Sequence, residues 1–236
     1  MARGRTAGGQ SAPLTPERII DAALRISDAE SDLDRLTVRR LASELGVGTM
    51  TLYSYFRSKD EILDGMADHV LGGMQLPAEP ATSPEQALRS VAFAFLTMMR
   101  EHPSVVRLLA TRITDSRAAL HGAMESVLQY LVEAGIRGPA AVRCYGFLIT
   151  YAIGFASYQT PRPWGRPDGP GSADVRRQRM HFYAGLPLED FPQMVELAEH
   201  LVDLPGDDQY AAGLEAFVES VVRSLPQPAE QPGTPA

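Results

Sequence analysis

The sequence predicts an all-α fold, in which an N-terminal three-helix domain of the helix-turn-helix type precedes a larger helical domain. Apolar residues recur at the three- and four-residue spacing of amphipathic helices along most of the 236 residues. No segment carries a strand signal, and no internal repeat is present. Hydrophobic residues make up 44% of the chain, which is enough to form a sizeable core.

The stretch from 37 to 59 has the pattern of two short helices joined by a tight turn. Thr37 is expected to cap a first helix over 38–45, and Gly46 occupies the position where helices commonly end in a left-handed residue. A second helix is expected from Thr49 to Phe56. Its outward side chains are small, hydroxyl-bearing or aromatic, as the major groove of DNA requires. An ordinary helical hairpin inside a core is the alternative interpretation of this turn.

The segments around this stretch complete an N-terminal domain, which we place at residues 14–75. Residues 1–13 have no periodicity and are predicted to be a disordered arm. Thr15, followed by proline, is a typical start for the first helix. The sequence from Ser58 has the spacing of a capping box, which predicts a further helix from about Lys59 to Met74. The run LPAEPATSP then marks a boundary between two bodies.

The second body is predicted to be a helical domain over residues 83–225. Residues 161–173 are dominated by proline and glycine and are expected to form a flexible loop. Residues 226–236 are expected to be a disordered tail. Apolar stripes and helix-end signals predict helices over 83–101, 103–110, 115–134, 139–160, 174–184, 187–201 and 208–225.

Charge and cysteine content restrict the class of protein. The net charge is -7, but residues 1–59 carry nine basic and seven acidic residues, an excess of +2, while the remainder carries thirteen basic and twenty-two acidic residues. This distribution permits DNA binding without establishing it. The single cysteine, Cys144, excludes an internal disulfide and indicates a cytoplasmic protein. No secretory signal and no membrane-spanning apolar run is expected.

Patterns that would indicate an enzyme or a metal site were sought in the sequence. None of the five histidines pairs with another at metal-ligand spacing, and no phosphate-binding or dinucleotide-binding glycine motif occurs. Asp64, Asp68 and His69 lie close together, but a solvated helix face is the preferred interpretation. Cys144 lies on an apolar helix and is expected to be packed. The sequence therefore predicts no catalytic residue, no metal ligand and no cofactor.

The letters LTVRRLASELGV, TLYSYF and SKDEIL resemble the helix-turn-helix of the TetR family of bacterial repressors, a resemblance that covers residues 14–70. The later segments FYAGLPLEDFPQMVELAEHL and QYAAGLEAFVESVV are similar to the tetracycline-repressor class of ligand domains. The resemblance implies a ligand-responsive regulator, most often a repressor, that binds a near-palindromic operator in double-stranded DNA as a homodimer. The alternative is a helical small-molecule-binding protein with a vestigial helix-turn-helix.

The resemblance also implies which residues contact DNA. Met50 and Ser54 are expected at base edges, because the apolar Met50 suits a thymine methyl group. The hydroxyl-bearing residues and Lys59 are expected to hold the phosphate backbone. Gly48 departs from the family, which often has a serine cap there. The predicted contact residues are Thr37, Arg39, Arg40, Gly48, Thr49, Met50, Thr51, Tyr53, Ser54, Tyr55 and Lys59.

For the second domain, the resemblance implies an inducer site and pairing of two subunits through helices 139–160 and 208–225. Large side chains on helices 83–101 and 139–160 predict a small apolar or aromatic inducer, with core packing as the alternative interpretation. The loop 161–173 is expected to close the entrance as a lid. The predicted ligand-contacting residues are Phe95, Met98, Met99, Phe147, Tyr151, Phe155 and Trp164.

Charged residues set limits on the inducer. Arg100 and Arg143 are the cations nearest to the predicted site, and either could serve an acidic group. Tetracycline repressors carry a histidine and a threonine at the end of their sixth helix for a magnesium-bound drug. Here Arg107 stands near the histidine position, and Thr111 follows. We therefore do not expect magnesium–tetracycline chemistry in this chain.

Overall fold

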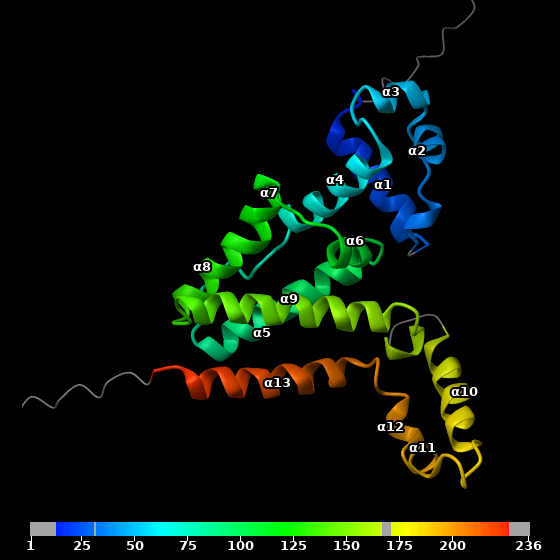
Figure 1. Cartoon of the computed structure of the whole chain (residues 1–236), viewed down its shortest axis with the longest axis vertical. Helices are drawn as coiled ribbons and strands as arrows, with labels where there is room; N and C mark the ends of the chain where they lie inside the picture. Colours follow the sequence, from blue (N-terminus) through cyan, green and yellow to red (C-terminus); the bar gives the residue numbers. More distant parts are fainter. Residues whose placement is uncertain (1–12, 31, 167–170, 227–236) are drawn as a thin grey trace, which may run out of the picture.

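The computed structural model describes residues 13–30, 32–166 and 171–226, and every regular element within these ranges is helical. Four N-terminal helices form one bundle, and α5, α9 and α13 run alongside one another in the second body (Figure 1). The helices α10 to α12 project from the end of that body (Figure 1). The predicted arm and tail lie, apart from Pro13 and Pro226, outside the described residues.

The N-terminal bundle is held together by helix caps and an apolar centre. Thr15 Oγ1 accepts a hydrogen bond from Arg18 N at 3.3 Å, as expected of a cap. Ile19, Leu41, Leu52 and Met66 from four different helices are almost fully buried. The elements are α1 (Pro16–Asp28), η1 (Leu33–Arg35), α2 (Val38–Leu45), α3 (Thr49–Tyr53) and α4 (Lys59–Gly72).

Helix α3 is shorter than the sequence predicted, ending at Tyr53 rather than at Phe56. The Ser54 hydroxyl donates a hydrogen bond to the Thr51 carbonyl oxygen at 2.7 Å. Serine side chains that bond to nearby backbone carbonyls compete with the regular helix ladder, which favours an end at this residue. Helix α4 likewise ends at Gly72, two residues before the predicted Met74.

Helix α5 is the centre of the second body. Leu88, Phe95 and Met99 on this helix are buried, and α5 packs against α8, α9 and α13. The elements of this body are α5 (Pro84–Glu101), α6 (Val105–Thr111), α7 (Arg117–Ala119), η2 (Leu120–Glu125), α8 (Ser126–Glu133), α9 (Pro139–Gln159), η3 (Pro163–Gly165), α10 (Ser172–Ala184), α11 (Pro192–Glu196), α12 (Ala198–Leu201) and α13 (Asp207–Ser224).

The helix predicted over 115–134 is interrupted by a π-helical turn, η2. A Cβ atom on Gly122 would lie 2.6 Å from the Leu71 carbonyl oxygen, so the turn packs directly on the backbone at the end of α4. The Ser126 hydroxyl donates to the His121 carbonyl oxygen at 2.7 Å, which satisfies an acceptor on this turn. The sequence signals for α-helix and π-turn are the same, so the interruption was not predicted.

The helix predicted over 187–201 is also divided. Residues 187–191 form a turn instead, in which Phe191 N donates to the Pro187 carbonyl oxygen at 2.9 Å. Helices α11 and α12 follow and are separated at Leu197. Proline at 192 suits the first turn of a helix, which explains why α11 begins there.

Helix α9 corrects the expectation that no segment could span a membrane. The helix has 21 residues and its most apolar 18-residue window has a mean hydropathy of 1.3, so its length and composition alone would allow a crossing. In this fold α9 packs against α5, α6 and α8, as a core helix does. Only 33% of its most apolar window is buried, and one side of α9 is therefore an exposed apolar face.

Candidate nucleic-acid interface and effector cavity

The turn between α2 and α3 forms as its residues predict. Thr37 Oγ1 accepts a hydrogen bond from Arg40 N at 3.1 Å and so caps α2. Gly46 ends that helix with a φ of 67°, in the left-handed region that glycine adopts without strain. Gly48 precedes α3 without a side-chain cap, as expected from the missing hydroxyl. The first backbone N–H groups of α3 therefore have no side-chain partner from this residue.

The outward face of α3 is exposed and uncharged. The Met50 side chain is 78% exposed, whereas Leu52, two residues later, is 1% exposed and holds α3 against the bundle. Thr49, Thr51 and Tyr53 are also exposed. This arrangement presents apolar and hydroxyl groups on a short helix that protrudes at one end of the bundle (Figure 1).

Two predicted contact residues have roles within the protein. The Tyr55 hydroxyl donates a hydrogen bond to the Leu14 carbonyl oxygen at 3.0 Å and ties the start of the chain to the end of α3. The predicted phosphate contact by Tyr55 stays a prediction, and it would require this hydroxyl to leave the Leu14 carbonyl oxygen. Ser54, at the end of α3, uses its hydroxyl hydrogen within the chain, so toward a base it could only accept a hydrogen bond.

The three predicted cations near this face differ in their environment. Arg39 and Arg40 are both exposed, and Arg40 is paired with Glu30 at 2.8 Å. Lys59 begins α4 and is half-buried, directly after the cap Ser58. Within the predicted capping box, Ser58 Oγ accepts from Glu61 N, but Glu61 reaches Arg57 N instead of the cap residue. Lys59 thus lies at a helix N-terminus, where an anion is favoured.

Three of the predicted ligand residues form an aromatic ladder between α9 and α13. The Phe147 ring stacks on Phe217 with a centroid separation of 3.7 Å. The Tyr151 ring stacks on Tyr210 at 4.8 Å, and Phe155 contacts the same Tyr210 ring at 4.9 Å. Stacked rings at these separations stabilise helix packing. The geometry of this cluster therefore favours packing between α9 and α13.

The remaining predicted ligand residues are also used in packing. Phe95 and Met99 are in the core, where the Phe95 ring meets Tyr145 edge-on. Trp164 is partly buried, and the Arg179 guanidinium lies 5.1 Å from its ring centroid. Trp164 therefore packs on α10, and its predicted ligand contact stays a prediction. Residues 167–170 of the predicted loop are outside the described part of the chain.

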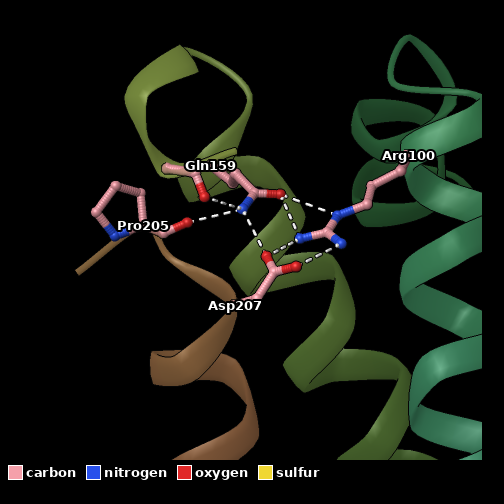
Figure 2. A network of polar contacts seen from close by, with 5 residues as sticks. Arg100, Gln159, Pro205 and Asp207 are labelled. Atoms are coloured by element: carbon pink, nitrogen blue, oxygen red, sulfur yellow. Dashed lines mark hydrogen bonds and ion pairs between the residues drawn. The ribbon is translucent and has the colours of Figure 1, made fainter. Parts of the chain in front are cut away.

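Arg100 is engaged within the protein and is not aimed at an open site. Its guanidinium pairs with Asp207 at the start of α13 and donates to Gln159 Oε1 at 3.1 Å (Figure 2). The buried Gln159 amide also donates to the Pro205 carbonyl oxygen at 2.7 Å. Although burial raises the pKa of Asp207, the Arg100 guanidinium lowers it to a value below the ordinary one. This network fixes the start of α13 to α5 and α9.

A cavity that the sequence did not reveal lies between α4 and α5. It has a volume of about 850 Å³, and among the predicted ligand residues only Met98 lines it. The wall combines apolar groups, such as Phe93 and Met74, with side chains that can form hydrogen bonds. Its lining is His69, Val70, Gly73, Met74, Gln75, Leu76, Pro77, Gln86, Arg89, Ser90, Phe93, Ala94, Thr97, Met98, Glu101 and His102.

Sequence reasoning missed this cavity because it considered only one face of α5. The face with Phe95 and Met99 carries the stronger apolar stripe and became the core. Ser90, Phe93 and Thr97 recur at three- and four-residue spacing on the other face. That mixed stripe was the available signal. A further cavity of about 690 Å³ lies along α9 and includes Phe147, Tyr151 and Phe155 in its wall.

The comparison with protein families decides the identity of this arrangement. The family described as bacterial regulatory proteins, tetR family, matches residues 19–66, which contain the exposed helix α3 and its supporting helices. The family described as tetracyclin repressor-like, C-terminal domain, matches residues 76–222. The chain belongs to the TetR family. The matched family is described as regulatory proteins, and ligand-responsive transcriptional regulation is the function of this chain.

Several TetR-family proteins are similar over most of this chain. The HTH-type transcriptional repressor DrrR1 of Streptomyces coeruleorubidus is 31% identical over 92% of this chain and 80% of its own length. The class D tetracycline repressor of Escherichia coli is 25% identical, with 88% of each chain covered. The Streptomyces coelicolor protein ActR, in complex with actinorhodin, superposes with a TM-score of 0.73 at 31% identity, covering 92% of this chain and all of that one.

Polar joints connect the helix-turn-helix bundle of this TetR-family regulator to its second body, and two of them have close hydrogen bonds. Arg112, at the end of α6, pairs with Asp60 at 2.6 Å and Asp64 at 2.5 Å on α4, and these carboxylates raise the pKa of the guanidinium. On the other side, the Asp28 carboxylate at the end of α1 accepts from His102 Nδ1 at 2.9 Å. This hydrogen bond raises the pKa of His102.

Proposed function

We propose that the protein is a homodimeric repressor that binds a near-palindromic operator and is released by a small, largely apolar or aromatic molecule. We also propose a division of the chain into a DNA-binding domain over 14–75 and an effector and dimerisation domain over 83–225. The observation that carries the proposal is the exposed, uncharged face of α3, with Met50 at its centre. A helix of this kind, supported by a bundle, suits the major groove.

This orientation of α3 supports a proposed role in DNA binding for each of several residues. Met50 is exposed and apolar, so it is suited to a thymine methyl group, while Thr49, Thr51 and Tyr53 offer hydroxyls to phosphates. Thr37 and Lys59 stand at the N-termini of α2 and α4, where helix dipoles favour phosphate. Arg39 is the better candidate for a contact with the wall of the groove, because Arg40 is already paired with Glu30.

The exposed apolar face of α9 supports a homodimer through α9 and α13. Val142 is 60% exposed, and Phe147 and Tyr158 are 37% and 41% exposed. Exposed rings in a row on a long helix are typical of protein interfaces, where apolar residues are removed from water. The cavity of about 690 Å³ along α9 would then be filled by side chains of the second subunit.

The cavity between α4 and α5 is the effector site that we favour. Its volume of about 850 Å³ is within the range of small-molecule sites, and it is bordered by the helix that joins the two bodies. Apolar groups from Phe93, Met74 and Met98 suit a hydrophobic or aromatic body. Ser90 and Thr97 suit hydrogen-bonding substituents on it. Arg89 is paired with Glu215 at 2.6 Å, so it does not favour a highly charged effector.

Selection of bound fragments from random DNA tests the DNA-binding part of the proposal. We expect a near-palindrome, with half-sites about one helical turn (~34 Å) or a multiple apart. Binding to bulk DNA should also rise as salt falls, because phosphate contacts release counterions. No binding at about 50 mM salt would leave the small-molecule-binding protein with a vestigial helix-turn-helix as the better account.

Release of the selected operator tests the effector part. A panel of apolar and aromatic compounds, with actinorhodin as its first member because the similar ActR structure contains it, should include molecules that release the operator. Coupling is reciprocal, so operator DNA should weaken the binding of such a compound by the same factor. If all releasing compounds are small, highly charged molecules, the assignment of the cavity fails.

A further inference from the structure

The joint between α1 and the start of α6 has a less exposed carboxylate than the joint that Arg112 makes with Asp60 and Asp64. Asp28, the last residue of α1, accepts from His102 Nδ1 at 2.9 Å, from Ser104 N at 3.1 Å and from Ser104 Oγ at 2.5 Å. The Asp28 side chain is only 16% exposed, and Ser104 is 2% exposed. Charge-assisted hydrogen bonds in a buried setting are among the stronger polar interactions.

His102 belongs to this joint and to the proposed effector cavity at the same time. Its imidazole binds Asp28, and the residue lines the cavity together with Met98 and Val70. Asp28 and Ser104 are not among the cavity residues. Within the joint, His102 is therefore the residue that a molecule in the cavity would contact.

A second histidine offers an internal comparison. His69 Nε2 lies 3.3 Å from Asp21 Oδ1, and His69 also lines the cavity. Asp21 and Asp28 are seven residues apart, about two turns, and so face the same side of α1. The Asp21 pair is much more exposed, with 45% and 48% of the two side chains accessible. Exposed pairs contribute little, so the buried pair should dominate.

We propose that His102 couples the α4–α5 cavity to the DNA-binding bundle, by turning from Asp28 toward an oxygen acceptor on the cavity's occupant. This inference rests on the proposed function and refines its ligand class to aromatic molecules that carry a carbonyl or phenolic oxygen. Loss of the His102 contact loosens α1 from α6, because Asp28 then keeps only its bonds from Ser104. A molecule that binds this released arrangement better shifts the protein toward it.

A covalent occupant tests the coupling and does not require the natural effector. Thr97 is an exposed residue of the cavity wall on α5, about one turn before His102. Thr97→Cys treated with 4-hydroxybenzyl methanethiosulfonate carries an aromatic ring with a phenolic oxygen in the cavity, held through a mixed disulfide. We expect this label to weaken binding to the selected operator about tenfold, a typical coupling. Combined with Asp28→Asn, the label should change that affinity less than about twofold, since the contact to be broken is already weakened.

Matched variants separate coupling from general damage. Asp21→Asn makes the same change at the exposed pair on the same helix and should leave the effect of the label intact. Arg137→Cys, which is exposed and not among the cavity residues, carries the same label and should retain full operator affinity. Mass measurement verifies one label per chain, because the native Cys144 is buried. His102→Gln replaces Asp28→Asn if circular dichroism shows that the latter does not fold.

The outcomes are distinguishable. An equal effect of the label with and without Asp28→Asn overturns the role of His102 and leaves the proposed function standing. The role of His102 is also overturned if Asp21→Asn removes the effect of the label as completely as Asp28→Asn does. A labelled Thr97→Cys protein that binds operator like the unlabelled one overturns the assignment of the cavity itself. Failure to recover any DNA by selection overturns the proposed repressor function.

Discussion

The faces of α9 and α5 are both partly apolar, but they differ in what surrounds them. On α9, exposed rings line a cavity of about 690 Å³, and Thr150 and Gln209 are among its few polar members. On α5, the cavity of about 850 Å³ is bordered by α4 and contains histidines bonded to α1. A broad apolar face suits a second protein subunit, whereas a mixed cavity beside the connecting helix suits a small regulator.

A negative charge on α9 is the change from which we expect the largest effect. Thr150→Glu places a carboxylate on an exposed helix position that lines the α9 cavity. The free subunit should tolerate the change, but pairing would remove the charge from water at a cost of several kcal/mol. Sedimentation should show a folded monomer that no longer binds the palindrome tightly. Gln129→Glu, on the outer side of α8, is the control and should remain a dimer.

A DNA-contact variant tests whether the α9 face acts only in pairing. Lys59→Ala should weaken binding to all sequences alike, about tenfold, and lower the slope of log affinity against log salt by about 1. Its dimer should be unchanged in sedimentation. Tyr53→Phe should act in the same direction more weakly, and Met50→Ala should alter preference at one base pair. An unchanged salt slope for Lys59→Ala would mean that α4 does not approach the backbone.

Tyr210 lies between the two faces and tests how independent they are. Its ring stacks on Tyr151 of α9, and its hydroxyl donates to the Ala92 carbonyl oxygen of α5 at 2.9 Å. Tyr210→Phe removes one buried hydrogen bond and should lower the free energy of unfolding by about 1 kcal/mol. Urea unfolding measures this. A change in dimerisation or operator release larger than the change in stability would show that the faces are coupled through this ring.

The pH dependence of stability is the smallest expected effect. The hydrogen bond to Asp28, and to a lesser extent the charges of Asp28 and Glu101, raise the pKa of His102 above its ordinary value of 6.5. Its contribution is therefore fully present below pH 6.5 and is lost as pH rises through the raised pKa. We expect a loss of about 1 kcal/mol or less, absent in His102→Gln. If the wild-type and His102→Gln proteins lose stability in parallel as pH rises, a group other than His102 is responsible for the loss.

The local signals in the sequence predicted the helix-turn-helix well. Thr37, Gly46 and Ser58 act on residues within four positions of themselves, so their caps and turns follow from the letters alone. The fold class, the family and the positions of the long helices were confirmed for the same reason. The shortened α3 arises from a serine bond whose competition with the helix was not anticipated.

Contacts between distant residues could not be predicted in this way. The Tyr55 hydroxyl bonds to Leu14, and the Tyr151 ring stacks on Tyr210, which is 59 positions away. Periodicity identifies an apolar face, but it does not say whether that face meets the core, a cavity or a second subunit. This is why the stacking of Phe147 and Tyr151 with rings of α13 and the cavity at Phe93 were not predicted, while the ligand contact of these two residues stays a prediction.

The number of subunits bound to each operator duplex, measured over a range of salt concentrations, tests directly whether the protein binds DNA as a dimer through phosphate contacts. Sedimentation of the protein with a duplex that carries the selected palindrome gives the number of subunits per duplex and the affinity together. The account predicts two subunits on each duplex and a steep loss of affinity as salt rises from about 50 to 200 mM. A single subunit per duplex, or an affinity that salt does not change, would contradict it.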